Sequence, residues 1–242
     1  MNLLQLRKKF RSLSGRFDLV NEDGSDNGAD FFINSGQRHL DRMDETQKSV
    51  GSSFRFLEIS GFSVQFPFCR AIKEVWVGST TARWQLEKKD LQDLLTGYFT
   101  TLPSGITTGE PLYYSPAISR AVPETYKTPA DELESFVGYV DTMSANHFAY
   151  NSILIAPPSD ERLVVDVRGL FYTDQLESNT DKSYWSEVHP DVLIMSAMRM
   201  VEVINRNSQG VNDWDSAIAA AVLGIGKDLV EEEIAEVTQI QD

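Results

Sequence analysis

Residues 52–77 read SSFRFLEISGFSVQFPFCRAIKEVWV, and this stretch decides the fold class. Its apolar positions fall between polar residues at Phe54, Phe56, Ile59, Phe62, Val64 and Phe66, and residues 71–77 resume the pattern after Pro67. Aromatic and β-branched residues at a period of two are typical of strands with one buried face. The stretch therefore predicts a block of β-strands.

Further strands are predicted at residues 82–86 and 112–114. Two apolar runs, within residues 152–172, flank the turn Pro157-Pro158-Ser159-Asp160-Glu161 and predict a β-hairpin. Residues 87–98 predict a helix, because Leu91, Leu94 and Leu95 recur at helical spacing. Residues 117–150 are the least regular part of the chain, and within them residues 131–140 predict a short helix.

Helical periodicity dominates both ends of the chain. Leu3, Leu6, Phe10, Leu13 and Phe17 predict a helix over residues 3–19 with its cations on a solvated face, and residues 29–43 predict a second helix. Pro190 suits a first helical turn, and residues 192–204 are apolar almost all round, which predicts a helix enclosed by the protein or by an assembly. Residues 213–237 predict a last helix, in which Gly224 and Gly226 indicate close helix packing or a kink.

Together these elements predict an α+β fold. We expect a helical bundle formed by residues 1–50 with 185–242, and an inserted antiparallel β-rich domain with short helices over residues 51–184. No internal repeat is visible.

The charge balance excludes a simple nucleic-acid clamp. The 242 residues contain 36 Asp and Glu against 22 Lys and Arg, a formal net charge of −14. Binding to a polyphosphate depends on cations that displace condensed counterions, so a strongly anionic chain repels DNA unless its cations are concentrated on one face.

Sequence motifs for enzymatic chemistry are absent. The chain lacks the GxSxG, GxxxxGK[ST] and GxGxxG patterns, and His39, His147 and His189 do not have metal-ligand spacing. The single cysteine, Cys69, lies in an apolar run and is expected to be a small buried hydrophobe. We expect no cofactor, metal or catalytic residue. Carboxylate pairs such as Asp131 with Glu134, or Glu231 with Glu233, leave a hydrolase as an alternative.

The loop Asp23-Gly24-Ser25-Asp26-Asn27-Gly28 resembles the first half of an EF-hand. Asn34 stands at the twelfth position, where a bidentate carboxylate is needed. The preferred interpretation is an Asx-turn loop in which Asp26 or Asn27 caps the second helix. A calcium-dependent binding module that uses Asp23, Ser25 and Asn27 is the other alternative.

Opposite charges gather at the two ends of the chain. Residues 1–20 have a net charge of +4, and residues 212–242 have a net charge of −7. This asymmetry favours contact between the ends, either within a subunit or head to tail between neighbours. The candidate partner-binding residues are Arg7, Lys8, Lys9, Arg11, Glu231, Glu232, Glu233 and Glu236.

The order of these segments resembles that of the head-to-tail adaptor, or connector, proteins of tailed bacteriophages. The resemblance covers most of the chain outside residues 117–150. It is carried by residues 27–41 (NGADFFINSGQRHLD) after the opening helix, residues 69–77 (CRAIKEVWV), the region 153–172 with its Pro-Pro-acid turn, and residues 189–194 (HPDVLI).

The resemblance implies a virion structural protein without enzymatic activity. Such proteins form a homo-oligomeric ring, usually of twelve copies, that binds the portal and continues the DNA channel toward the tail or nozzle protein. It also implies that residues 237–242, including Val237 and Ile240, contact the portal, and that residues 153–172 face the tail. Double-stranded DNA would pass through without specific binding. The expected location is the virion head–tail junction, after assembly in the host cytoplasm. The amino-terminal residues do not read as a secretory signal, and no membrane span is expected.

Overall fold

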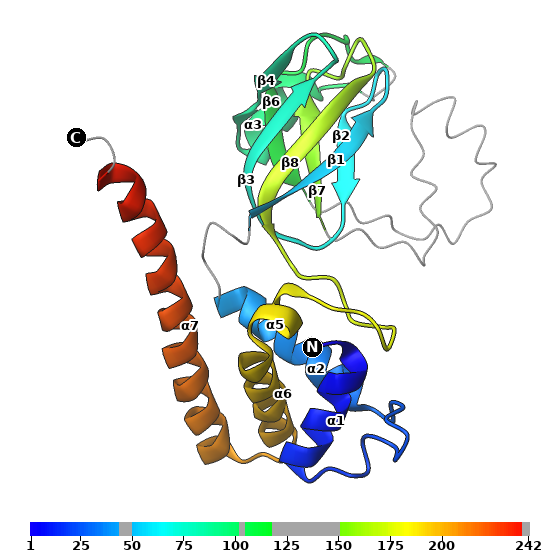
Figure 1. Cartoon of the computed structure of the whole chain (residues 1–242). Helices are drawn as coiled ribbons and strands as arrows, with labels where there is room; N and C mark the ends of the chain where they lie inside the picture. The colour runs from blue at the N-terminus through cyan, green and yellow to red at the C-terminus, as the bar shows by residue number, and fades with distance from the viewer. Residues whose placement is uncertain (44–49, 102–104, 118–150, 239–242) are drawn as a thin grey trace, which may run out of the picture. The chain divides into compact units, whose positions relative to one another are not determined.

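The computed structural model describes residues 1–43, 50–101, 105–117 and 151–238, with side chains up to Lys227 in the last helix. The fold is α+β, as predicted. The chain divides into two compact units (Figure 1). The helical unit comprises Met1–Ser49 with Tyr172–Asp242, and the β-unit comprises Val50–Phe171. The segment from Tyr172 to Ser183 therefore belongs to the helical unit.

Among the residues that the structure describes, the helical unit contains five helices: α1 (Leu3–Ser14), α2 (Ala29–Met43), α5 (Tyr184–Val188), α6 (Pro190–Ile204) and α7 (Ser208–Thr238). Helix α6 contacts each of the other four. Five of its ten apolar side chains after Pro190 are buried and its three methionines are half-buried, which agrees with the predicted enclosure over most of the helix, although Val203 and Ile204 are exposed at its end. The core gathers Leu3, Leu6, Phe10, Phe32, Ile33, Leu40, Trp185, Val192, Leu193, Ala197, Val201 and Ile218.

Helix α1 is shorter than the predicted helix 3–19. Asn2 and Gln5 form a capping box at its start. Its end is fixed by Gly15, which adopts a left-handed conformation with φ +66° and donates its N–H to the carbonyl of Arg11. Phe17 therefore lies outside the helix and is 64% exposed, and Leu13 in the last turn is 55% exposed. Of the apolar residues that predicted this helix, only Leu3, Leu6 and Phe10 reach the core, so a core position for Leu13 and Phe17 is wrong.

Helices α2 and α6 approach each other closely at Gly36. A Cβ at this position would lie 2.7 Å from the backbone nitrogen of Ala197, and the Ser196 hydroxyl donates to the Gly36 carbonyl at 2.9 Å. Only glycine permits this contact. The observed bounds of α2 match the predicted helix 29–43.

The segment after the β-unit is held to α2 by paired polar contacts. Asn34 exchanges two hydrogen bonds with the backbone of Leu176, at 3.0 and 2.9 Å. The buried carboxylate of Asp41 accepts from the backbone and hydroxyl of Thr173 and from the Trp185 indole, all within 2.8 Å. These bonds satisfy a buried charge at the centre of the helical unit.

The described part of the β-unit contains two four-stranded sheets and one short helix. One sheet has the order β1-β8-β3-β4, and the other has the order β2-β7-β6-β5. All pairs are antiparallel except β5 with β6. The strands are β1 (Val50–Leu57), β2 (Ser63–Phe66), β3 (Cys69–Gly78), β4 (Arg83–Gln85), β5 (Glu87–Lys88), β6 (Tyr113–Ala117), β7 (Asn151–Ala156) and β8 (Leu163–Phe171), with α3 (Leu91–Tyr98) after β5. Side chains from both sheets share one core, which includes Val75, Ile153 and Val165.

The predicted hairpin over residues 152–172 is wrong. Both strands exist, but β7 pairs with β2 and β6 in one sheet, and β8 pairs with β1 and β3 in the other. Pro157 and Pro158 follow β7 directly and have no N–H, so the ladder cannot continue into a tight turn. The connection instead carries the chain from one sheet to the other.

Three smaller expectations are settled by the structure. The predicted helix 87–98 begins only at Leu91, because Asp90 caps it and Glu87–Lys88 pair with β6. The predicted last helix begins earlier, at Ser208. Cys69 is buried in the core of the β-unit, as predicted, and burial raises the pKa of its thiol to about 11. The predicted helix 131–140 lies outside the described residues.

Candidate functional site

The cations of α1 differ in how far their side chains are buried. Lys8 and Lys9 are exposed, and Arg11 is half-buried with its guanidinium 5.0 Å from the Phe17 ring centroid. Arg7 is buried, so its predicted place on a solvated face is wrong. Its guanidinium donates to both carboxylate oxygens of Asp30 at 2.6 Å and to the side chain of Asn179. The hydrogen bond to Asp30 raises the pKa of Arg7.

The acidic residues predicted at the other end lie on α7. Its backbone is helical to Thr238, so Glu231, Glu232, Glu233, Glu236 and Val237 are on the last turns of one helix. Nothing is described of their side chains, and Ile240 lies outside the described residues. The structure thus places the predicted cations and acids on two different helices, α1 and α7, of the same unit.

The described part of α7 has two faces that differ in burial. Trp214, Ile218, Ala221, Val222 and Ile225 pack into the core of the helical unit. The remaining face is exposed and mixed: Asn212, Asp213 and Lys227 are exposed at its ends, and between them Leu223 is 63% exposed among small side chains. We call this the α7 outer face, which consists of Ser216, Ala217, Ala219, Ala220, Leu223 and Gly224.

Two glycines of α7, Gly224 and Gly226, do not pack closely within the described chain. An ideal Cβ on Gly224 or Gly226 meets no described atom within 4 Å, so the prediction of close helix packing is wrong here. Glycine in a helix interior lowers helix stability, and no close packing within the described chain compensates for it at these two positions.

A charged cluster holds α7 to its neighbours. Asp215 on α7 pairs with Arg199 on α6, and the nearer carboxylate oxygen lies 3.5 Å from Nε2 of His39 on α2. Burial lowers the pKa of His39, and the positive charge of Arg199 lowers it further. This cluster fixes the rotation of α7, and with it the direction of the α7 outer face.

The loop that resembles half an EF-hand is built from Asx turns, as predicted. Oδ1 of Asp26 accepts from the N–H groups of Gly28 and Asp30, both at 3.0 Å, and so caps α2. Asn27 does not cap the helix, since its side chain donates to the carbonyl of Asp18. Asp23 accepts from the backbone and hydroxyl of Ser25, and these bonds lower its pKa.

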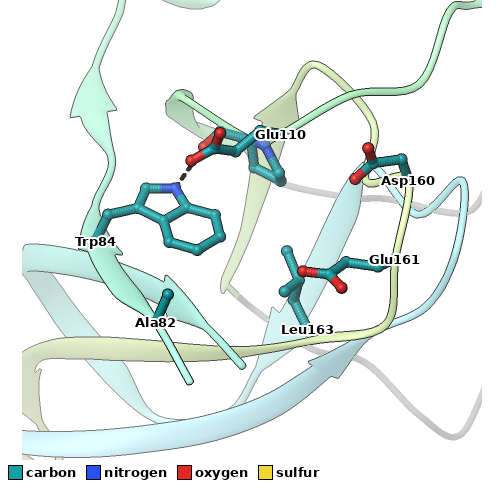
Figure 2. Close-up of a pocket in the computed structure, with 7 residues that line it drawn as sticks. Ala82, Trp84, Glu110, Asp160, Glu161 and Leu163 are labelled. Carbon is teal, nitrogen blue, oxygen red and sulfur yellow. Dashed lines mark hydrogen bonds between the residues drawn. The ribbon is translucent and has the colours of Figure 1, made fainter. Parts of the chain in front are cut away.

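The β-unit contains a pocket of about 410 Å³ that the sequence analysis did not find (Figure 2). Its lining comes from three separated segments, and the residues are Ala82, Trp84, Glu110, Pro111, Asp160, Glu161 and Leu163. The lining includes no histidine, cysteine, serine or lysine. The Pro-Pro-acid turn was the only signal for it, because the sequence gives no indication that residues 82–84 and 110–111 lie beside that turn.

The carboxylate pairs considered for a hydrolase lie elsewhere. Asp131 and Glu134 are outside the described residues, and the side chains of Glu231 and Glu233 are not described. Among the side chains that the structure does describe, no three histidine, cysteine or acidic residues are grouped so that they could hold a metal ion.

No protein-family model matches the sequence, and no curated protein matches it either. Across the described helices, none is both long and apolar enough to cross a membrane.

Proposed function

We propose that this protein is a non-enzymatic structural protein of a tailed bacteriophage, a head-to-tail adaptor. It assembles as a ring of copies of itself, twelve in the proteins that it resembles. The ring lies between the portal and the tail or nozzle protein and continues the DNA channel. In this proposal the helical unit is a bundle that packs against neighbouring copies, and the β-unit is an insertion into it.

The α7 outer face is the observation that carries the proposal. Leu223 is 63% exposed, and the exposed residues on its N-terminal side are small (Ser216, Ala217, Ala219 and Ala220, with Gly224 next to it), while Lys227 follows one turn later. In this proposal the exposed strip, on a helix whose other face is docked into the core, is the surface on which a neighbouring copy packs. Small residues also let a second helix come close, so a neighbouring copy fits this face better than a polar ligand does.

The charges of the helical unit support a contact between copies in which each copy contributes a different surface. Lys8 and Lys9 of one copy complement the acidic last turns of α7 in the next, which bear Glu231, Glu232, Glu233 and Glu236. A contact between two different surfaces of the same chain is heterologous, and such contacts close into rings when the rotation between neighbours permits.

The net charge of −14 suits a conduit for DNA. An anionic ring repels the phosphate backbone and therefore does not retain the DNA that passes through it.

A charge placed on the α7 outer face tests the proposal. We expect Leu223→Glu to abolish assembly of the full chain with the portal and tail proteins, measured by mass photometry, while the thermal unfolding temperature stays close to that of the wild type. The matched control is Leu95→Glu on α3, since Leu95 is also an exposed helical leucine, at 39%. A wild-type protein that stays monomeric and binds neither partner contradicts the proposal, as does unchanged assembly of Leu223→Glu.

A further inference from the structure

The pocket of the β-unit has a rigid aromatic wall. Trp84 lies on β4 opposite Val77 of β3, and it packs against the core of the β-unit. Its indole N–H donates to the carbonyl of Pro111 at 2.7 Å, which fixes the ring, as the dashed line in Figure 2 shows. The buried side chain of Leu163 contributes to the same wall. An aromatic ring held in one orientation offers its negatively polarised face to a cation.

Three exposed carboxylates stand around this ring. Asp160 and Glu161 lie across the pocket from Trp84, and Glu110 comes from the segment before β6 (Figure 2). None of the three forms an ion pair within the described residues. The pocket is therefore anionic and has no cation of its own in its lining.

The loops that carry these carboxylates are fixed by their backbones. Ser159 is fully buried, and its backbone exchanges hydrogen bonds with Ser60 and Gly61 at 2.7 and 3.0 Å. The N–H of Gly109 donates to the carbonyl of Pro158 at 2.8 Å, which joins the Glu110 segment to the Asp160 segment. Asp160 and Glu161 thus project from a pre-organised loop, and a ligand would not have to order it.

The size of the pocket and the segments that carry its carboxylates bear on the kind of cation that fits it. Among the described side chains, these carboxylates are not grouped so that they could hold a metal ion. The volume of about 410 Å³ also lies within the range of pockets that take organic groups. The size of the pocket and the placement of its carboxylates on separate segments fit an organic cation beside the indole.

We infer that this pocket binds the guanidinium group of an arginine side chain presented by a protein partner. A guanidinium stacks on an indole through its flat face and has five N–H donors directed outward, so it can reach carboxylates on separate loops. A lysine ammonium is a compact, strongly hydrated point charge and matches this arrangement less well. The three carboxylates disfavour free arginine, whose own α-carboxylate they repel. The inference stands independently of ring formation.

Titration with small arginine derivatives tests the inference on the full chain. The readout is the indole N–H resonance of Trp84 in isotope-labelled protein, assigned through Trp84→Phe. We expect N-acetylarginine amide to shift this resonance saturably, with a dissociation constant on the order of millimolar. We expect weaker binding of N-acetyllysine amide and of free arginine.

Paired variants separate the pocket from general charge effects. Asp160→Asn with Glu161→Gln is expected to weaken binding by about fivefold. Glu87→Gln with Asp93→Asn removes the same charge from exposed residues of the same unit and is expected to leave binding unchanged. The inference is overturned if Trp84 does not respond, if both double variants behave alike, or if calcium chloride or N-acetyllysine amide binds more tightly. Because the test uses no portal or tail protein, its failure leaves the adaptor proposal untouched.

Discussion

Arg7 shows how one buried cation links two helices at the amino end. Its side chain is 5% exposed and its partner Asp30 is 22% exposed, and the two oxygens of Asp30 accept from Nε and Nη2. Asp30 lies in the first turn of α2, where a carboxylate also complements the helix dipole. Removing one partner of a buried ion pair lowers the stability of the fold strongly, because the remaining charge is left buried without a partner.

We therefore predict that Asp30→Asn lowers the free energy of unfolding by about 3 kcal/mol. The double variant Arg7→Met with Asp30→Asn should recover part of this loss, since no unpaired charge is left. Urea denaturation of the two variants measures both effects. A loss below about 1 kcal/mol in Asp30→Asn, typical of exposed ion pairs, would contradict the prediction.

His39 makes stability depend on pH. Because burial and Arg199 hold its pKa below the ordinary value of 6.5, the unfolded chain takes up the proton first as the pH falls. Its contribution to stability is complete above pH 6.5 and is lost as the pH falls from there toward the lowered pKa. Arg42 acts in the same direction, and Asp215 opposes the shift.

The prediction is that the free energy of unfolding decreases below pH 6.5 and that His39→Gln flattens this decrease. Urea denaturation of the wild type and the variant at a series of pH values above and below 6.5 measures the difference in their free energies of unfolding. Parallel curves for the two proteins would show that His39 is not the responsible group.

At the scale of elements, the α2–α6 contact depends on Gly36. We predict that Gly36→Ala destabilises the protein by about 1–3 kcal/mol, because the new Cβ meets the backbone nitrogen of Ala197 at 2.7 Å. Gly97→Ala is the matched control. It lies in α3 with no described atom within 4 Å of an ideal Cβ, so it should stabilise slightly through helix propensity, by up to about 1 kcal/mol. Equal effects at the two positions would refute the packing argument.

The acidic last turns of α7 yield a prediction about assembly. Replacing Glu231, Glu232, Glu233 and Glu236 by glutamine should weaken association between copies or with the portal, most clearly at low salt, where charge attraction is least screened. A control variant neutralises four exposed acids elsewhere: Glu22, Glu87, Asp93 and Glu177. Sedimentation at two salt concentrations measures both. Unchanged assembly of the α7 variant at low salt would remove this role.

The elements were largely predictable from local pattern, and their pairing was not. Helix α2 follows from its apolar spacing, whereas α1 ends early because Gly15 adopts a left-handed conformation that apolar spacing alone does not reveal. The strands β7 and β8 each read as apolar runs, but alternation within a strand does not specify its partner. The pocket was missed for the same reason. Its carboxylates and Trp84 meet only through contacts between distant segments.

In the whole molecule, two surfaces of the helical unit serve the proposed adaptor function. The α7 outer face provides an apolar contact surface. The opposite charges of α1 and of the end of α7 would orient one copy against the next. A ring uses both, since each copy then presents one surface to each neighbour. In the proposed ring, the summed negative charge of the copies would repel a passing duplex and leave it mobile.

Electron microscopy of the purified full chain mixed with its portal protein tests this account most directly. We expect closed rings seated coaxially on the portal, with an open central channel. Portal particles without added density, together with a monomeric chain in solution, would contradict it.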